Sequence, residues 1–443
     1  MIKGFSVVVV AILTLVFPLD SKAQSYGYSF FSSVGYSDNL AQLPVLGGGQ
    51  ETESGTVTTA GVEFNFQSDP NVEFVTSIDG AYARNWYSLD ELTSDDQRTL
   101  NLSGVYQPDD TNFRLGVFDS YLQVALDRES AQTVNNLRDI NVFSVVPSYF
   151  ILISPVSRIN TEYRFSSIRD KEGVTSRDFD IFTLGYERQV NSYLSLLVNA
   201  RKQNTELSDT DQEFKQEEGF VGISGRGGIT NFVLEYGRQR ILNDGGVNDA
   251  YQSSARFSLI RQINSFSSLT AGYSQGFGDA LTVDLDNTLV NVSANDQAGF
   301  SDGIVVEKAL NFRYTYVKRN LLLDVNVGAR TIKSDEDVQG NQGLFDEERT
   351  FFNFSLSDRF SNTGGVSAFG YQVRYFYSED EFNLTDQTQD TGSLALRLTY
   401  FASLNFETYI ELNSRDASGE AANNNFDERG GRIGFVYTPL IRN

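Results

Sequence analysis

The sequence predicts an all-β fold, a transmembrane antiparallel up-and-down β-barrel of about 20 strands with long extracellular loops and short periplasmic turns. Three observations lead to this prediction. Apolar residues recur at every second position, short and long polar connections alternate, and aromatic residues are numerous, with 22 Tyr and 34 Phe in 443 residues. Strands with one apolar and one polar face explain all three.

The first 23 residues have the features of a secretory signal peptide. Lys3 precedes an apolar stretch from Val7 to Phe17, and the small-residue site Ser21-Lys22-Ala23 follows. The stretch is too short to cross a bilayer as a helix, which takes about 20 apolar residues. We therefore expect residues 1–23 to be removed and residues 24–443 to form a single outer-membrane β-barrel domain. A retained N-terminal anchor is the alternative.

The two-residue alternation can be followed along the mature chain. It is clear at residues 26–30, 62–66, 232–236, 310–316, 321–327 and 394–400. Pro147 interrupts it, within the apolar stretch from Val142 to Leu152. Because proline cannot donate to a ladder and a closed barrel has no edge, we expect a bulge there or a misplaced strand boundary.

The connections between these segments sort by length. Tight turns are expected at residues 68–71, 108–110, 154–156, 318–320 and 361–364. Longer polar stretches cover residues 37–54, 87–97, 127–139, 170–178, 205–217, 242–249, 278–302, 334–348, 379–390 and 414–428. Ten long loops imply about 20 strands, with 18 or 22 tolerable, and both termini in the periplasm. Trp86 and Tyr87 suit an aromatic girdle at the outer interface, or simple loop packing.

The composition excludes several classes of function. The chain has no Cys and no His, which removes disulfides, thiolate or imidazole metal sites and Ser/His catalysis. With 58 acidic and 35 basic residues the net charge is -23, which disfavours nucleic acid as a partner. Asp335-Glu336-Asp337 lacks the spacing of a calcium loop, and Gly47-Gly48-Gly49 lacks the strand-to-helix context of a phosphate loop. We expect no cofactor, no metal and no enzymatic activity.

Charged residues inside the strands are expected to line the lumen, because charge on the lipid face is costly. The candidate lumen-lining residues are those that alternate with the apolar positions of their strands: Glu63, Arg114, Glu162, Arg164, Glu235, Arg313, Asp324, Arg330, Arg374, Arg397, Glu407 and Glu411. They either pair with one another across the wall or create a transverse field that filters solutes. Arg238 and Arg240 instead share the apolar parity, where they either meet lipopolysaccharide phosphates or snorkel at the loop base.

The start of the mature chain carries a recognisable motif. The segment Tyr36-Ser37-Asp38-Asn39-Leu40, after an aromatic strand, resembles the Tyr-x-Asp-Asn start of the beta-barrel porin 2 group and of outer-membrane barrels encoded with exopolysaccharide loci. This chain has Ala60-Gly61 where such proteins tend to carry Pro-Gly. The resemblance implies an outer-membrane location and a role in exporting or anchoring surface polysaccharide, and no catalytic residues.

The resulting expectation is a channel in the outer membrane of a Gram-negative bacterium, for surface polysaccharide or small solutes. Its partners would be outer-membrane lipid, lipopolysaccharide and polysaccharide export machinery. A structural or docking barrel with a plugged lumen is the alternative, since a long loop such as 278–302 could constrict the lumen. A carboxylate-dependent outer-membrane hydrolase is a third possibility.

Overall fold

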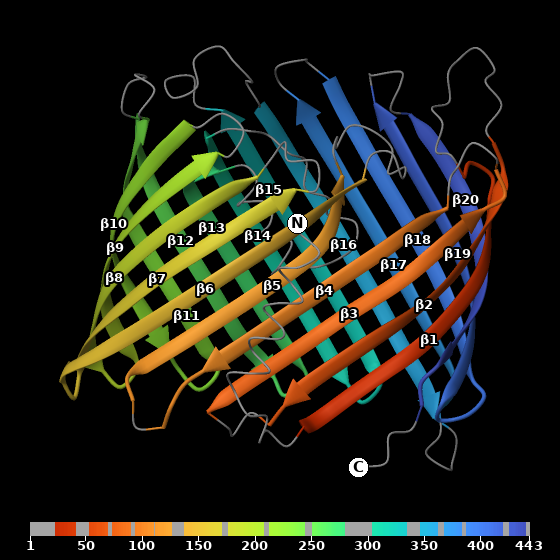
Figure 1. Ribbon diagram of the computed structural model, residues 1–443, viewed down its shortest axis with the longest axis horizontal. Coiled ribbons are helices and arrows are strands. Elements are labelled where there is room, and N and C mark those ends of the chain that lie inside the picture. The colour runs from red at the N-terminus through yellow and green to blue at the C-terminus, as the bar shows by residue number, and fades with distance from the viewer. Residues whose placement is uncertain are drawn as a thin grey trace.

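The protein is a closed barrel of 20 antiparallel strands, as the sequence predicts (Figure 1). Each strand pairs with its neighbours in the chain, and β1 pairs with β20 to close the wall. The strands are β1 (Ala23–Ser37), β2 (Gly55–Ser68), β3 (Phe74–Tyr87), β4 (Asp95–Tyr106), β5 (Phe113–Ala125), β6 (Leu137–Ser154), β7 (Ser157–Asp170), β8 (Arg177–Asn191), β9 (Leu194–Leu207), β10 (Gln212–Arg226), β11 (Thr230–Asn243), β12 (Ala250–Asn264), β13 (Ser267–Asp279), β14 (Ile304–Lys318), β15 (Leu321–Ser334), β16 (Asp346–Ser361), β17 (Ser367–Phe382), β18 (Gln387–Phe401), β19 (Phe406–Gly419) and β20 (Phe426–Tyr437).

The computed structural model describes most of the chain. The described residues are 23–40, 53–69, 73–89, 94–109, 111–125, 137–170, 176–207, 212–243, 250–279, 304–334, 346–361, 367–382, 387–419 and 425–439. The expected signal peptide lies outside these ranges except for Ala23, with which β1 begins. The loop 278–302 lies outside them except for its first two residues, and the segments 335–337 and 47–49 lie wholly outside.

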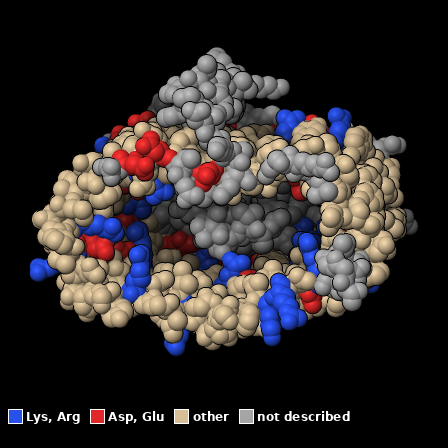
Figure 2. Space-filling model, turned by 90° about the horizontal axis from the view of Figure 1, so that it is seen from below, with Lys and Arg blue, Asp and Glu red and all other residues tan. Residues whose placement is uncertain are grey.

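The alternation predicted from the sequence separates the two faces of the wall. Tyr28, Phe64 and Tyr82 belong to one face and are exposed, whereas Glu63, between them in register, belongs to the other. Seen from the end with the short turns, the molecule is a ring whose outer surface is mostly uncharged, with charged side chains around its inner rim (Figure 2). The outer face therefore suits lipid, and the inner face suits water.

The strands are longer than the sequence indicates. They span 12 to 18 residues, and several ladders run into segments expected to be loops. The β17–β18 ladder continues to the pair Phe382 and Gln387, so most of the loop expected at residues 379–390 is strand. The loop expected at residues 414–428 is likewise mostly β19 and β20. Charged residues make these strand extensions polar but do not end the hydrogen-bonded ladder. A prediction based on polarity therefore makes the loops too long and the strands too short.

Pro147 lies within β6, where neither a bulge nor a strand boundary occurs. It stands opposite Leu115 of β5. On the other side the β6–β7 ladder passes from the pair Val145 and Phe165 to the pair Ser148 and Glu162 in one unchanged register. The prediction of a bulge is therefore wrong. The wall tolerates the missing N–H by omitting two bridges, since the flanking pairs hold the register.

Among the residues that the structure describes, no helix has the length and apolarity needed to span a bilayer. Small apolar clusters support the wall near the long loops: Ile140, Ile168 and Phe179 pack together, and Ile241, Ala250 and Phe277 form a second cluster. The second cluster borders the polar network described below.

Candidate functional site: the inner wall of the barrel

The nominated lumen residues lie on the polar parity of their strands, and the structure joins many of them in cross-strand contacts. Arg313 of β14 contacts Asp324 of β15 at 2.8 Å, with two hydrogen bonds from the guanidinium Nε to the carboxylate. Arg330 of β15 reaches Glu307 of β14 at 3.0 Å. These pairs agree with the expectation that wall charges neutralise each other. That they line an aqueous lumen stays a prediction.

Four of the nominated residues form one cluster on β17, β18 and β19. Arg374 reaches over β18 to Glu411 at 3.3 Å, and Arg397 contacts Glu407 at 3.5 Å. The Arg397 guanidinium also lies 3.7 Å from the ring centroid of Tyr409. The cluster thus presents a planar cation on an aromatic face, flanked by two carboxylates, a surface that offers stacking and hydrogen bonds to a polar solute.

The remaining nominated residues have weaker or neutral partners. Arg164 and Glu162 lie 3.8 Å apart on β7. Asn199 donates a hydrogen bond to Glu235 at 2.5 Å, and Ser29 donates one to Glu63 at 3.4 Å. Arg114 accepts a hydrogen bond at its backbone carbonyl from Ser148, at 3.4 Å. These five nominated residues are therefore less tightly paired than the nominated residues on β14 to β19.

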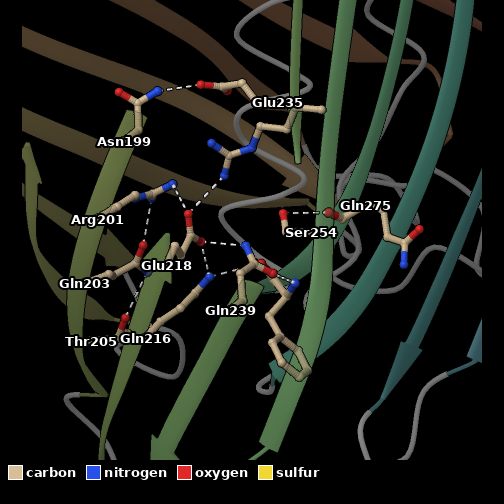
Figure 3. A network of polar contacts seen from close by, with 12 residues as sticks. Asn199, Arg201, Gln203, Thr205, Gln216, Glu218, Glu235, Gln239, Ser254 and Gln275 are labelled. Atoms are coloured by element: carbon tan, nitrogen blue, oxygen red, sulfur yellow. Dashed lines mark hydrogen bonds and ion pairs between the residues drawn. The ribbon is translucent and has the colours of Figure 1, made fainter. Parts of the chain in front are cut away.

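One buried polar network on this face was not nominated from the sequence (Figure 3). It centres on Glu218 of β10, whose side chain is 2% exposed between two guanidinium groups. Arg256 of β12 lies 3.2 Å from one carboxylate oxygen, and Arg201 of β9 lies 4.0 Å from it. Gln239 donates to the other oxygen at 2.7 Å, and Gln216 donates to it as well. A buried carboxylate is tolerated only with such complete pairing.

The Glu218 network also holds the end of β13 against the inner wall. Gln239 accepts a hydrogen bond from the backbone N–H of Phe277 at 2.5 Å, and Gln216 donates to the Phe277 carbonyl at 3.3 Å. A Cβ on Gly276 would lie 2.5 Å from the Gln239 amide oxygen, so a larger residue there would displace the amide that binds Phe277. The backbone leading into residues 280–303 is therefore fixed to β10 and β11 by two glutamines that Glu218 orients.

Sequence parity contained part of the signal for this network. Glu218, Gln239 and Arg256 all fall opposite the apolar positions of their strands. The grouping could not be read from the chain, because β10 to β12 come together only through their register, and because Glu217 beside Glu218 hides the parity of that carboxylate. Glu218 also lies one residue past the expected loop 205–217.

Lysine is confined to one face of the described strands, whereas arginine occurs on both. In the described strands each lysine takes the outer parity, as Lys202, Lys308 and Lys333 illustrate. The inner face of the same strands carries arginine as its cation. Arginine's planar guanidinium holds a carboxylate in fixed geometry, whereas lysine is a flexible point charge. The inner wall is thus built for fixed pairing.

The described part of the inner face contains pockets, two of which border charged side chains. One, of about 540 Å³, is near the short turns, where the ion pair of Arg158 and Glu187 borders Gln189, Asn231 and Ser258. The other, of about 460 Å³, is lined by two carboxylates, Glu63 and Asp79, and by neutral side chains such as Asn65 and Asn101. In the part of the chain that the structure describes, no three acidic residues gather as a metal would require.

Comparisons with known proteins give matches to solved structures at low sequence identity. No family model and no curated protein matches the chain. Among solved structures, the ferric citrate transporter FecA in the unliganded form has a TM-score of 0.45 and 10% identity, over 93% of this chain and 78% of that chain. OccAB3 of Acinetobacter baumannii has a TM-score of 0.37 and 12% identity, over 94% and 99%. The iron transporter FrpB of Neisseria meningitidis has a TM-score of 0.43 and 10% identity, over 95% and 82%.

Proposed function

We propose that this protein is an outer-membrane channel for water-soluble solutes. The observation that carries the proposal is the division of the closed wall into an apolar outer face and an inner face of paired charges. A closed barrel leaves no unpaired strand edge in lipid, which makes it one of the two structures able to span a membrane. A barrel of this strand number encloses space beyond what its own wall side chains fill.

The chemistry of the wall favours polar solutes of low net charge, with carbohydrate as the leading class. Pairs such as Arg313 with Asp324 and Arg374 with Glu411 present donors and acceptors while leaving little net charge. The Arg397 guanidinium, held over the buried ring of Tyr409, adds a planar group of N–H donors for the hydroxyls of a sugar. Passage of surface polysaccharide is the extended form of the same proposal and agrees with the resemblance at Tyr36–Leu40.

The test is a pair of flux measurements on the purified, folded barrel. In planar bilayers it should conduct ions, and in proteoliposomes it should admit neutral oligosaccharides faster than amino-acid anions or cations of equal size. Heat-denatured protein, which does not insert into the bilayer as a barrel, serves as the control. Insertion without any conductance would contradict the channel and favour the docking barrel. Selection for one sign of charge over neutral sugars would contradict the solute class.

A further inference from the structure

The outer face carries a groove between β9 and β12. It has a volume of about 780 Å³. Its floor follows one row of paired residues across four strands, Ala200 on β9, Gly219 on β10, Arg238 on β11 and Ser253 on β12. Three of these four side chains are small. One row nearer the short turns stand Val198, Val221 and Tyr236, which are 50%, 61% and 62% exposed. An apolar trough on a lipid-facing wall is a place where an acyl chain can lie.

The row on the long-loop side of the groove is charged. There Lys202, Glu217, Arg240 and Tyr251 stand side by side in register. The guanidinium groups of Arg238 and Arg240 lie 5.4 and 5.5 Å from the ring centroid of Tyr251, which holds both over one aromatic face. Against the single carboxylate of Glu217 stand three cations, so the rim of the groove is positively charged.

We infer that this groove binds a phosphorylated glycolipid of the outer leaflet, of the lipopolysaccharide type. The phosphate would lie on Arg238 and Arg240, and an acyl chain would run down the groove along Val198, Val221 and Tyr236. The order of the rows sets this orientation, because the cations are on the long-loop side and the apolar row is on the short-turn side. Guanidinium and phosphate form bidentate, charge-assisted hydrogen bonds, which a neutral headgroup cannot supply. The inference requires membrane insertion and is independent of whether the lumen conducts.

The test uses the purified full-length barrel in detergent and counts bound lipid by native mass spectrometry. The probes are lipid A with two phosphates, the same lipid without phosphates, and phosphatidylglycerol. The charge variant is Arg238→Gln with Arg240→Gln. The groove variant is Gly219→Leu, since a Cβ at Gly219 meets no atom within 4 Å and the side chain fills the groove without strain in the wall. Gly228→Leu, equally open at the β10–β11 turn, is the control for added apolar surface.

The charge variant should bind lipid A about tenfold more weakly than the natural chain, equivalent to the loss of one strong contact. It should no longer distinguish lipid A from its dephosphorylated form. Gly219→Leu should weaken binding of both forms, and Gly228→Leu should weaken neither. Heat-modifiable migration on gels shows that both variants are folded. If either folded variant bound lipid A as tightly as the natural chain, the inference would be overturned. Equal binding of phosphatidylglycerol and lipid A would overturn the assignment to a glycolipid.

Discussion

Asp38 and Arg429 bind each other twice across the seam where the barrel closes. The backbone N–H of Asp38 donates to the Arg429 carbonyl at 3.1 Å, and the backbone N–H of Arg429 donates to the Asp38 carboxylate at 2.7 Å. Ser37 donates to Glu428 at 2.9 Å, and the fully buried Asn39 donates to the Asp427 carbonyl at 3.1 Å. The Tyr-x-Asp-Asn motif of this chain therefore fastens the outer end of β1 to the start of β20.

Removing the seam contacts should weaken the closed barrel. In Asp38→Ala the amide of Arg429 loses its acceptor, and in Asn39→Ala the Asp427 carbonyl loses its donor. Each change should lower the free energy of unfolding by about 1 kcal/mol. The midpoint of urea unfolding, followed by the gel shift of the folded form, measures the loss. Asp109→Ala, in an exposed turn, is the control and should have no effect. Unchanged midpoints in both seam variants would show that the motif does not fasten the strands.

Closure itself should depend on small side chains in β20. A Cβ on Gly434 would lie 2.5 Å from the Tyr409 hydroxyl and 2.8 Å from the Ser32 carbonyl, so the residue is squeezed between β19 and β1. We expect Gly434→Val to reduce the amount of assembled protein strongly, and deletion of residues 431–443 to abolish assembly, because β20 pairs with both neighbours there. Quantitative blots of outer-membrane fractions measure both. Full assembly of the deletion protein would contradict the register of β20.

The sequence predicted much of this fold because its signals are local. The strand count follows from a two-residue period and from the alternation of short and long connections, and in β20 Ile433, Phe435 and Tyr437 are exposed on the outer face. The strand ends were less predictable. Residues such as Glu379 and Asp390 have loop-like polarity, yet they pair in the β17–β18 ladder because hydrogen bonding continues beyond the apolar belt.

The sequence predicts which residues share the inner face, because they alternate with the apolar residues, but it does not predict which of them contact each other. Arg374 and Glu411 are both nominated by their own strands, but their contact passes over β18, and only the tertiary register brings them together. The network around Glu218 shows the same limit, since its members come from β9 to β13. Parity identifies a face, whereas pairing depends on the register of several strands at once.

Single cysteines can test which face meets water, because the chain has no cysteine of its own. Ala395 and Leu396 are neighbours on β18 with opposite parity, and Leu396 is exposed among the outer apolar residues. A charged, membrane-impermeant thiol reagent should modify Ala395→Cys in the inserted protein and lower its conductance. Leu396→Cys should react only after unfolding. The reverse pattern of labelling would mean that the inner and outer faces are exchanged.

The Glu218 network should control both wall charge and the position of the β13 end. Glu218→Gln keeps the shape but leaves Arg201 and Arg256 without their shared carboxylate, so we expect the anion-to-cation permeability ratio to rise about twofold. Gln239→Leu leaves the charge unchanged but removes the acceptor of the Phe277 amide. It should therefore increase current fluctuations without changing selectivity. Reversal potentials and single-channel noise in planar bilayers separate the two effects. Identical behaviour of the two variants would show that the network acts as one structural unit.

Arg313 gives the sharpest test of the paired wall. A lone arginine facing water could be reversed to glutamate with a simple gain in cation preference. Arg313, however, makes two hydrogen bonds to Asp324, which also accepts one from Thr315 at 2.8 Å.

Arg313→Glu would place two carboxylates together, and repulsion between them should reduce assembly as well as change selectivity. Arg313→Gln leaves Asp324 without its cation and should shift the reversal potential toward cations, by an amount that shrinks as salt rises because ions screen the exposed charge. Arg313→Gln combined with Asp324→Asn restores neutrality and should return the selectivity to that of the natural chain. If the double variant kept the cation shift of the single one, the pair would not be the charge-balancing unit of the wall.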